Sequence, residues 1–150
     1  MEERQKIEYE SKLIDLRRVA RVTAGGKRFN FRATILVGNR DGKIGLGTAK
    51  GADTLMAIEK ATRAAKKNAV KISLTENKSV PYETEGKFKS VYIKIKPSFE
   101  GGKGLVAGGA VRAVLTLVGV KNASAKIISS SKNKINNAKA AIEALKKLKN

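Results

Sequence analysis

Residues 16–37 read Leu-Arg-Arg-Val-Ala-Arg-Val-Thr-Ala-Gly-Gly-Lys-Arg-Phe-Asn-Phe-Arg-Ala-Thr-Ile-Leu-Val and contain two runs of strand-favouring residues that meet at Gly25 and Gly26. Glycine readily takes the positive φ values of tight hairpin turns, so this stretch predicts a β-hairpin. Alternate positions of the second run are apolar, which predicts that one face packs on a core while most of the other meets solvent. The predicted core face comprises Phe29, Phe31, Ala33, Ile35 and Val37.

Six basic residues crowd the same hairpin: Arg17, Arg18, Arg21, Lys27, Arg28 and Arg32. In an ordinary protein, a solvated strand surface would be an equally good interpretation of such a cluster. The whole chain, however, has 32 Lys and Arg residues against 13 acidic residues, a formal net charge of +19. A surplus of that size repels itself in the compact state unless a polyanion neutralises it, so we expect a nucleic acid as partner.

A membrane surface is the alternative polyanion, but it typically binds a long amphipathic basic helix with bulky apolar anchors, and the chain has no Trp. No apolar run approaches the roughly 18 residues of a membrane span, and the first residues are charged, unlike a signal peptide. We therefore expect a cytoplasmic protein that binds no membrane. Because the chain has neither Cys nor His, we also expect no metal, no cofactor and no small-molecule substrate.

After the hairpin, turn-forming residues lead into a third predicted strand over 44–49. Gly45, Gly47 and Ala49 fall on one face of that strand, which would let a helix, another backbone or a phosphate chain approach closely. Gly45, Gly47 and Lys50 also match nucleotide-binding glycine loops, but only weakly, since the remaining residues of both known patterns are missing.

Asp53 is a good N-cap for a predicted helix over 54–71, because its carboxylate can accept hydrogen bonds from amides of the first turn. Two stripes recur at helical spacing along this helix. The stripe predicted to dock on the sheet comprises Leu55, Ile58, Thr62, Ala65 and Ala69. The second stripe is basic, belongs to the same compact unit as the hairpin, and comprises Lys60, Arg63, Lys67 and Lys71.

The composition becomes acidic between Thr75 and Gly86, where we place a domain boundary. We expect residues 1–11 to form a flexible arm, 12–76 a first domain and 77–150 a second. In the second domain, a hairpin is predicted to turn at Gly86 and to face inward with Val91, Ile93 and Ile95.

The rest of the second domain predicts a helix over 110–118, a strand over 123–129 and a last helix after Asn133. The order β-β-α-β-α is typical of a two-layer α/β sandwich, so we expect an α+β chain of two domains. Residues 98–109 are the most glycine-dense stretch and precede the first of these helices. Such a loop can cradle an anion or let two backbones pass closely, and both interpretations stay open.

Residues in both halves resemble a known family through their order and spacing, although no single motif is decisive. In the first half these are Arg18-Val19, Gly25-Gly26-Lys27, Phe29-Asn30-Phe31, Val37-Gly38, Gly42-Lys43-Ile44-Gly45-Leu46-Gly47, Lys50 and Ala57-Ile58-Glu59-Lys60-Ala61. In the second half they are Glu100-Gly101, Gly104, Ala107-Gly108-Gly109-Ala110-Val111-Arg112-Ala113-Val114, Gly119-Val120, Asn122, Asn133 and Ile135-Asn136. Nearly the whole chain thereby resembles the S-five family, the fifth protein of the bacterial small ribosomal subunit.

The resemblance implies a fold, a function and a location within the ribosome. It implies a double-stranded-RNA-binding-like amino-terminal domain of three antiparallel strands and a helix, and a carboxyl-terminal domain of the left-handed β-α-β type found in some small-molecule kinases. It also implies a structural ribosomal protein that binds small-subunit rRNA between body and head and influences translational accuracy. Its surroundings would be the decoding region, the region where messenger RNA enters, and the neighbouring ribosomal proteins S-four and S-eight.

The basic clusters and the resemblance together predict three sets of site residues. The predicted RNA-binding residues are Arg17, Arg18, Arg21, Gly25, Gly26, Lys27, Arg28, Arg32, Lys50, Lys60, Arg63 and Lys67. In the family the Gly-Gly hairpin reaches rRNA near the spectinomycin site, which implies that role for Val19, Ala20, Arg21, Gly25, Gly26 and Lys27. The resemblance implies a protein interface, facing the S-four neighbour, at Glu100, Gly101, Gly104 and Arg112.

Two other functions compete with this one. A kinase would use the glycine loop for phosphate, but phosphoryl transfer needs carboxylates for magnesium, and near this loop only Glu100 qualifies. A free-standing duplex-RNA chaperone would share all the electrostatics, and only sedimentation with ribosomes would separate it from a ribosomal protein. Since 5% of the residues are aromatic, we expect recognition of RNA backbone and shape over base readout.

Overall fold

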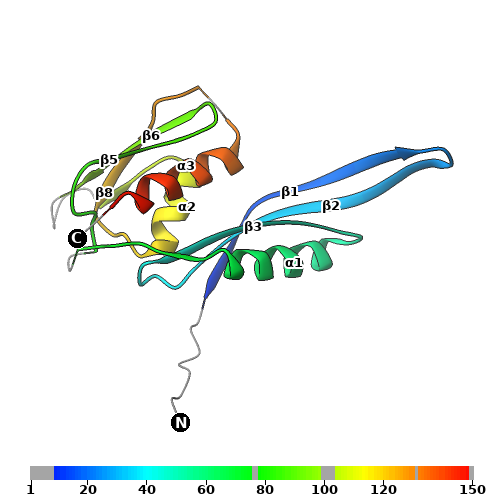
Figure 1. Cartoon of the computed structure of the whole chain (residues 1–150), viewed down its shortest axis with the longest axis horizontal. Coiled ribbons are helices and arrows are strands. Elements are labelled where there is room, and N and C mark those ends of the chain that lie inside the picture. Colours follow the sequence, from blue (N-terminus) through cyan, green and yellow to red (C-terminus); the bar gives the residue numbers. More distant parts are fainter. Residues whose placement is uncertain (1–8, 76–77, 99–103, 131, 149–150) are drawn as a thin grey trace, which may run out of the picture.

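The computed structural model describes residues 9–75, 78–98, 104–130 and 132–148, and it contains two four-stranded sheets (Figure 1). The first sheet is antiparallel and has the order β1-β2-β3-β4. Its four strands are β1 (Glu10–Thr23), β2 (Gly26–Gly38), β3 (Lys43–Gly51) and β4 (Val70–Lys71). Helix α1 (Thr54–Lys67) lies between β3 and β4 in the sequence.

The second sheet has the order β5-β6-β8-β7, in which β7 and β8 are parallel and α2 connects them. Its elements are β5 (Thr84–Phe88), β6 (Val91–Pro97), β7 (Leu105–Val106), α2 (Gly109–Val118), β8 (Ala123–Ile127) and α3 (Lys134–Lys146). The predicted α+β fold is confirmed, while the two-residue strands β4 and β7 were not predicted. The proposed boundary between residues 76 and 77 stays a prediction, because both lie outside the described residues.

Helix α1 packs on one face of the first sheet through its smallest residues. Ala57, Ala61 and Ala65 have no exposed surface. A Cβ atom added to Gly45 or Gly47 of β3 would collide with the backbone of this helix, at the carbonyl oxygens of Ala65 and Ala61. The glycines were expected to admit a helix, another backbone or a phosphate chain. In the structure, helix α1 occupies this face of β3 and leaves no room there for a phosphate chain.

The predicted docking stripe of this helix is right only in part, because Ala65 and, partly, Ile58 are buried against the first sheet. Leu55 is 73% exposed, and of that stripe only Ala65 is fully buried. At Gly45 and Gly47, β3 presents only backbone to α1. The helix therefore lies so close to the strand that only alanine side chains fit between them. The helix also ends at Lys67 with Asn68 as its C-cap, which places Lys71 in β4. Its start is as predicted, since an Asp53 carboxylate oxygen accepts a hydrogen bond from the Met56 amide at 2.8 Å.

The second half of the chain covers the opposite face of the first sheet. Leu36 and Ile44 have no exposed surface and belong to one core with residues of α2 and α3. Leu36 was predicted to lie on the face that mostly meets solvent, and that prediction is wrong for the inner part of the strand. From Ala33 to Gly38, β2 is buried on both faces. Alternation in the sequence describes only the outer part of this strand.

Backbone hydrogen bonds also join the two halves. The amides of Arg40 and Gly42, in the turn between β2 and β3, donate to the carbonyl oxygens of Leu117 and Val118, each at 2.9 Å. The last carbonyls of a helix have no partner within it, so this turn completes the hydrogen bonding of the α2 end. The halves therefore share both an apolar core and a backbone junction.

The hairpin of the second sheet differs from its prediction in one respect. Val91, Ile93 and Ile95 are fully buried, as predicted. The chain turns at residues 89–90 between β5 and β6, whereas Gly86 lies within β5 opposite Ile93. A side chain on Gly86 would collide with the backbone of α3, so this glycine permits close helix packing and does not form a turn.

The outer parts of β1 and β2 project beyond α1 as a two-stranded ribbon (Figure 1). At the opposite end of β1, Glu10 and Ser11 pair with Gly38 and Val37, so the strand includes the last two residues of the segment expected to be a flexible arm. Residues 1–8 of that segment lie outside the described residues.

Candidate nucleic-acid interface

The hairpin turns where the sequence predicts it. Thr23 pairs with Gly26, which leaves Ala24 and Gly25 as the two turn residues. The Thr23 hydroxyl donates a hydrogen bond to the Gly26 carbonyl oxygen at 3.1 Å. Gly26 has a φ of +131°, a backbone conformation that residues with a side chain rarely adopt. Only Gly26 of the paired glycines takes a positive φ.

The strand register sorts the hairpin cations onto two faces, because residues directly opposite each other in an antiparallel pair share a face. Arg17 lies opposite Arg32, and Arg21 lies opposite Arg28. On the other side of Arg32, its partner in β3 is Lys50. We call the surface formed by these five cations the arginine face.

The arginine face is poorly neutralised by the protein itself. Like charges placed directly opposite each other destabilise a sheet, and here two such pairs follow one another along the ribbon. Within the described ranges, only Arg17 has an acidic partner, at 3.0 Å from an Asp15 carboxylate oxygen. This arrangement favours the binding of an anion with several charges at strand spacing.

The opposite face of the ribbon carries two of the predicted cations among apolar side chains. We call it the Phe29 face, and it comprises Leu16, Arg18, Ala20, Val22, Lys27 and Phe29. The Arg18 guanidinium carbon lies 3.8 Å from the centroid of the Phe29 ring. Phe29 was predicted to lie in a core, yet it is 47% exposed because α1 does not reach it. A comparison of strand length with helix length in the sequence would have revealed this exposure.

The basic residues of α1 form a separate surface. Lys60, Arg63 and Lys67 are exposed on the side of the helix that faces away from its buried alanines. The first sheet lies between this surface and the arginine face, because α1 covers the face that Ala33, Ile35 and Val37 share with Phe29. The predicted RNA-binding residues therefore do not form one continuous patch.

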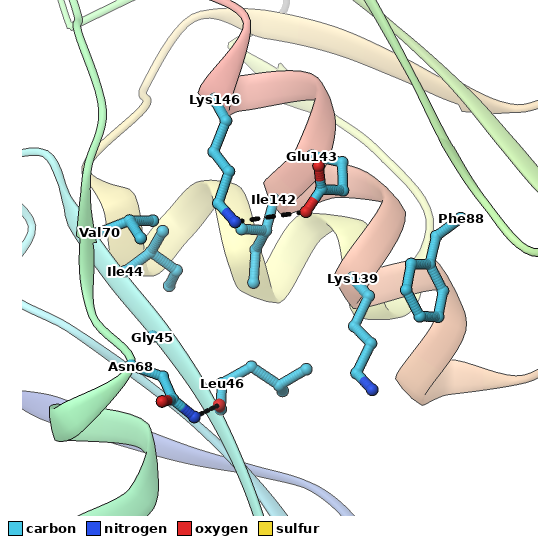
Figure 2. A pocket seen from close by; sticks show the side chains of 10 residues that line it. All are labelled: Ile44, Gly45, Leu46, Asn68, Val70, Phe88, Lys139, Ile142, Glu143 and Lys146. Carbon is cyan, nitrogen blue, oxygen red and sulfur yellow. Dashed lines mark hydrogen bonds and ion pairs between the residues drawn. The ribbon is translucent and has the colours of Figure 1, made fainter.

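A pocket of about 230 Å³ lies where the two halves meet (Figure 2). Its lining from the first half comprises Ile44, Gly45, Leu46, Asn68 and Val70, and its lining from the second comprises Phe88, Lys139, Ile142, Glu143 and Lys146. Figure 2 shows its carboxylate, Glu143, already paired with the Lys146 ammonium, at 3.3 Å, while the Lys139 ammonium lies 5.1 Å from the centroid of the Phe88 ring. The pocket thus presents no pair of free acid and base groups.

Metal-binding groups and membrane-spanning helices are both absent from the part of the chain that the structure describes. It contains no group of three or more His, Cys, Asp or Glu residues that could hold a metal ion. Nor is any helix in those ranges both long and apolar enough to cross a bilayer.

Comparison with known proteins identifies the family. A family model described as "Ribosomal protein S5, N-terminal domain" matches residues 9–73, and "Ribosomal protein S5, C-terminal domain" matches residues 86–150. The chain belongs to the ribosomal protein S5 family. This is the family of small-subunit structural proteins that the sequence resembles, and it is not a class of enzymes.

Relatives in the S5 family match almost the whole chain. The "Small ribosomal subunit protein uS5c" of Cyanophora paradoxa is 41% identical over 145 residues, which cover 97% of this chain and 85% of that protein. The "Small ribosomal subunit protein uS5" of Synechococcus elongatus is 42% identical over 95% of this chain and 78% of its own length. The corresponding protein of Thermosynechococcus vestitus is 40% identical over 95% of this chain and 80% of its own length.

The residues that the S5 resemblance implies for a protein interface are only partly described. Glu100 and Gly101 lie outside the described residues. Gly104 has a φ of +74° and precedes β7, and Arg112 is exposed on α2. The N-cap of that helix is Gly108, which has no side chain to cap the first amides.

Proposed function

We propose that this ribosomal protein binds small-subunit rRNA through the arginine face of its hairpin. The observation that carries the proposal is the pair of directly opposed arginines, Arg21 and Arg28, which have no acidic partner among the described residues. Phosphates are the anions that RNA presents at regular intervals, and arginine binds them with several N–H groups at once. Bound phosphates would remove the repulsion that the protein leaves in place.

Filter binding of the purified protein to structured small-subunit rRNA fragments, across a salt series, tests this proposal. We expect the logarithm of affinity to fall steeply with the logarithm of salt concentration, because each phosphate contact releases counterions. Arg21→Gln should reduce that slope by about 0.9 for one lost contact to paired RNA. The control Lys121→Gln removes the same charge from an exposed residue near Arg40, at the end of β2 opposite the hairpin turn, and should leave the slope unchanged. Equal slopes in both variants would refute the proposal.

The exposed α1 cations Lys60, Arg63 and Lys67 support a second contact with rRNA on the other side of the sheet. Because the sheet separates them from the arginine face, one RNA helix would not cover both surfaces. We therefore propose that the first domain lies between two segments of rRNA. Hydroxyl-radical footprints of a Lys60→Gln/Arg63→Gln variant should lose protection in a segment different from the one that Arg21→Gln exposes, and loss of the same segment would contradict this arrangement.

We further propose the position that the resemblance implies, between body and head, near the decoding region and the entrance for messenger RNA, with S-four and S-eight as protein neighbours. Arg112 is exposed and makes no ion pair with any described residue, which supports a contact outside the chain. We expect Arg112→Ala to leave melting and bulk RNA affinity nearly unchanged but to alter misreading of near-cognate codons. The measurement uses subunits assembled to equal occupancy, and identical error rates would leave Arg112 as ordinary surface.

A free-standing RNA chaperone in the cytoplasm would share this electrostatic surface. Sedimentation separates the two functions, because a ribosomal constituent should travel with the small subunit at salt concentrations that strip nonspecific RNA-binding proteins. We propose a cytoplasmic ribosome as its location. Detection of the protein in fractionated cells, with ribosomes of each compartment separated, would test that location.

A further inference from the structure

The Phe29 face of the ribbon exposes several apolar side chains. A surface that contacts only solvent would be expected to carry polar side chains instead. Phe29 is 47% exposed, Val22 is 76% exposed and Leu16 is 38% exposed, and the strand register places all three on this one face. A two-stranded ribbon gains little stability alone, so apolar side chains beyond the reach of α1 contribute no core. They indicate a contact with something flat and apolar outside the chain.

Arg18 contributes a planar cation to this face, and its orientation is fixed by a neighbouring ring. Its guanidinium lies over the Phe29 ring, with its central carbon 3.8 Å from the ring centroid. Such stacking fixes the guanidinium plane and leaves its N–H edges free to donate hydrogen bonds. No carboxylate of the described chain pairs with Arg18, and residues 16–32 contain no acidic residue at all. The chemistry of the face is therefore flat, apolar and cationic.

We propose that Arg18 and Phe29 form a stacking platform for one unpaired nucleobase of the bound RNA. A nucleobase is flat, carries acceptor atoms for guanidinium N–H groups, and belongs to a polyanion that Lys27 on the same face would also attract. This inference rests on the proposed binding of rRNA. It adds that the Phe29 face would bind a nucleobase of that RNA. Phosphates would lie against the arginine face, and the base against the Phe29 face, on opposite sides of the same two strands.

An apolar groove of another protein is the alternative partner for this face, and two observations favour RNA. The first is that the arginine face, on the same strands, is built for phosphates. The second is that a protein groove that accepted Phe29 and Val22 would have to neutralise Arg18 and Lys27 as well, whereas an RNA segment does so by its own backbone. If the ribbon lies between the RNA backbone and an unstacked base, the arginine face contacts phosphates and the Phe29 face contacts the base.

The test uses a short RNA stem with a single bulged 2-aminopurine and the same stem fully paired. Wild-type protein should bind the bulged stem about fivefold more tightly, the least that one base stacked on an aromatic side chain provides, and should quench the 2-aminopurine. Arg18→Lys keeps the charge but loses the plane, and Phe29→Leu keeps an apolar side chain but loses the ring. Both variants should bind the two stems equally and lose the quenching.

Arg40→Lys is the matched control, because it makes the same exchange in the turn between β2 and β3, on neither face of the ribbon, and should retain both the preference and the quenching. Since Arg18 and Phe29 are exposed, melting temperatures of all variants should agree with wild type. Binding of both wild-type stems without preference, or a preference that survives in Arg18→Lys and Phe29→Leu, would overturn the stacking platform and leave a protein groove as the partner. Failure of wild-type protein to bind either stem would instead refute RNA binding itself.

Discussion

Single residues without side chains control how closely the helices approach the sheets. Gly47 is one of them, and we expect Gly47→Ala to destabilise the protein by about 1–3 kcal/mol, because the new methyl group would force α1 away from β3. Thermal unfolding followed by circular dichroism measures this loss. Gly25→Ala is the matched control, since a Cβ there meets nothing within 4 Å, and equal melting of both variants would contradict the packing role of Gly47.

A second residue-scale prediction concerns Glu85 on the open face of the second sheet. The Tyr92 hydroxyl donates a hydrogen bond to its carboxylate, and Lys94 lies beside it, so the pKa of Glu85 is below its usual value of 4.5 despite some burial. Its contribution to stability is present above pH 4.5 and is lost as the pH falls through the lowered pKa. The same hydrogen bond raises the pKa of Tyr92 above its usual 10.0, so that contribution is lost at alkaline pH.

Tyr92→Phe should therefore move the pKa of Glu85 upward, toward its usual value, and weaken the loss of stability in acid. Carbon NMR of the carboxyl group across a pH titration measures the shift directly. Tyr82→Phe is the control, because it removes a hydroxyl whose hydrogen bond goes to the Lys147 carbonyl oxygen, at 3.1 Å. An unchanged Glu85 titration in Tyr92→Phe would show that Lys94 and Lys147 lower its pKa without help from the hydroxyl.

Residue identity alone could not predict which helix face docks. A periodic pattern of large side chains indicates burial in most helices, and by that rule Leu55 and Ile58 should face the sheet. Ile58 is partly buried there, but Leu55 is not, because Gly45 and Gly47 remove the side chains that a Leu would pack against. Small residues on a helix and glycines on the preceding strand are complementary, and that pairing is the sequence signal for Ala57, Ala61 and Ala65.

At the scale of elements, the hairpin could be predicted from its turn and its strand-forming residues, but the extent of its core could not. Alternation extended the core face to Phe29. A helix of 14 residues spans about 21 Å, whereas a strand of 13 residues spans about 43 Å, so α1 covers only half of β2. Relative length, more than periodicity, separates the buried half of this strand from the free ribbon.

The ribbon also predicts how its turn responds to substitution. Gly26→Val places a β-branched side chain at a φ of +131°, which distorts the turn, while no neighbouring atom lies within 4 Å to carry that distortion into a core. We therefore expect a small change in melting temperature and a clear loss of rRNA affinity. Gly25→Val, at a position without positive φ, should lose less affinity. Sharply lower melting with an unchanged RNA footprint would make the turn structural and not functional.

At the scale of the whole molecule, the two halves should unfold together, because Leu36 and Ile44 of the first sheet complete the core of the second half. Leu36→Ala should cost about 2–5 kcal/mol and lower the hydrogen-exchange protection of α1 and of β6 by similar amounts. Leu55→Ala, at a side chain that is 73% exposed, should change stability by less than about 0.5 kcal/mol. Two separate calorimetric transitions, or loss of protection in one half only, would show that the halves are independent.

This shared core is the part of the architecture that sequence reasoning could not supply. The change in composition after Thr75 predicts a boundary between two domains, and the two family models match residues 9–73 and 86–150. The same pattern gives no sign that Leu36, in a run of alternating residues, shares a core with helices that begin 73 and 98 residues later in the sequence. Burial on both faces of a strand requires a third layer, and that layer becomes visible only in three dimensions.

The projecting hairpin is, mechanically, a cantilever. Its root is clamped between α1 and the second half of the chain, and its free arm, from Leu16 to Thr23, extends about 25 Å at the usual rise per strand residue. A rotation of about five degrees at the root would then displace the tip by about 2 Å, enough to break a hydrogen bond there. Any adjustment of the packing between the two halves is thereby amplified at the far end of the arm, where the turn lies.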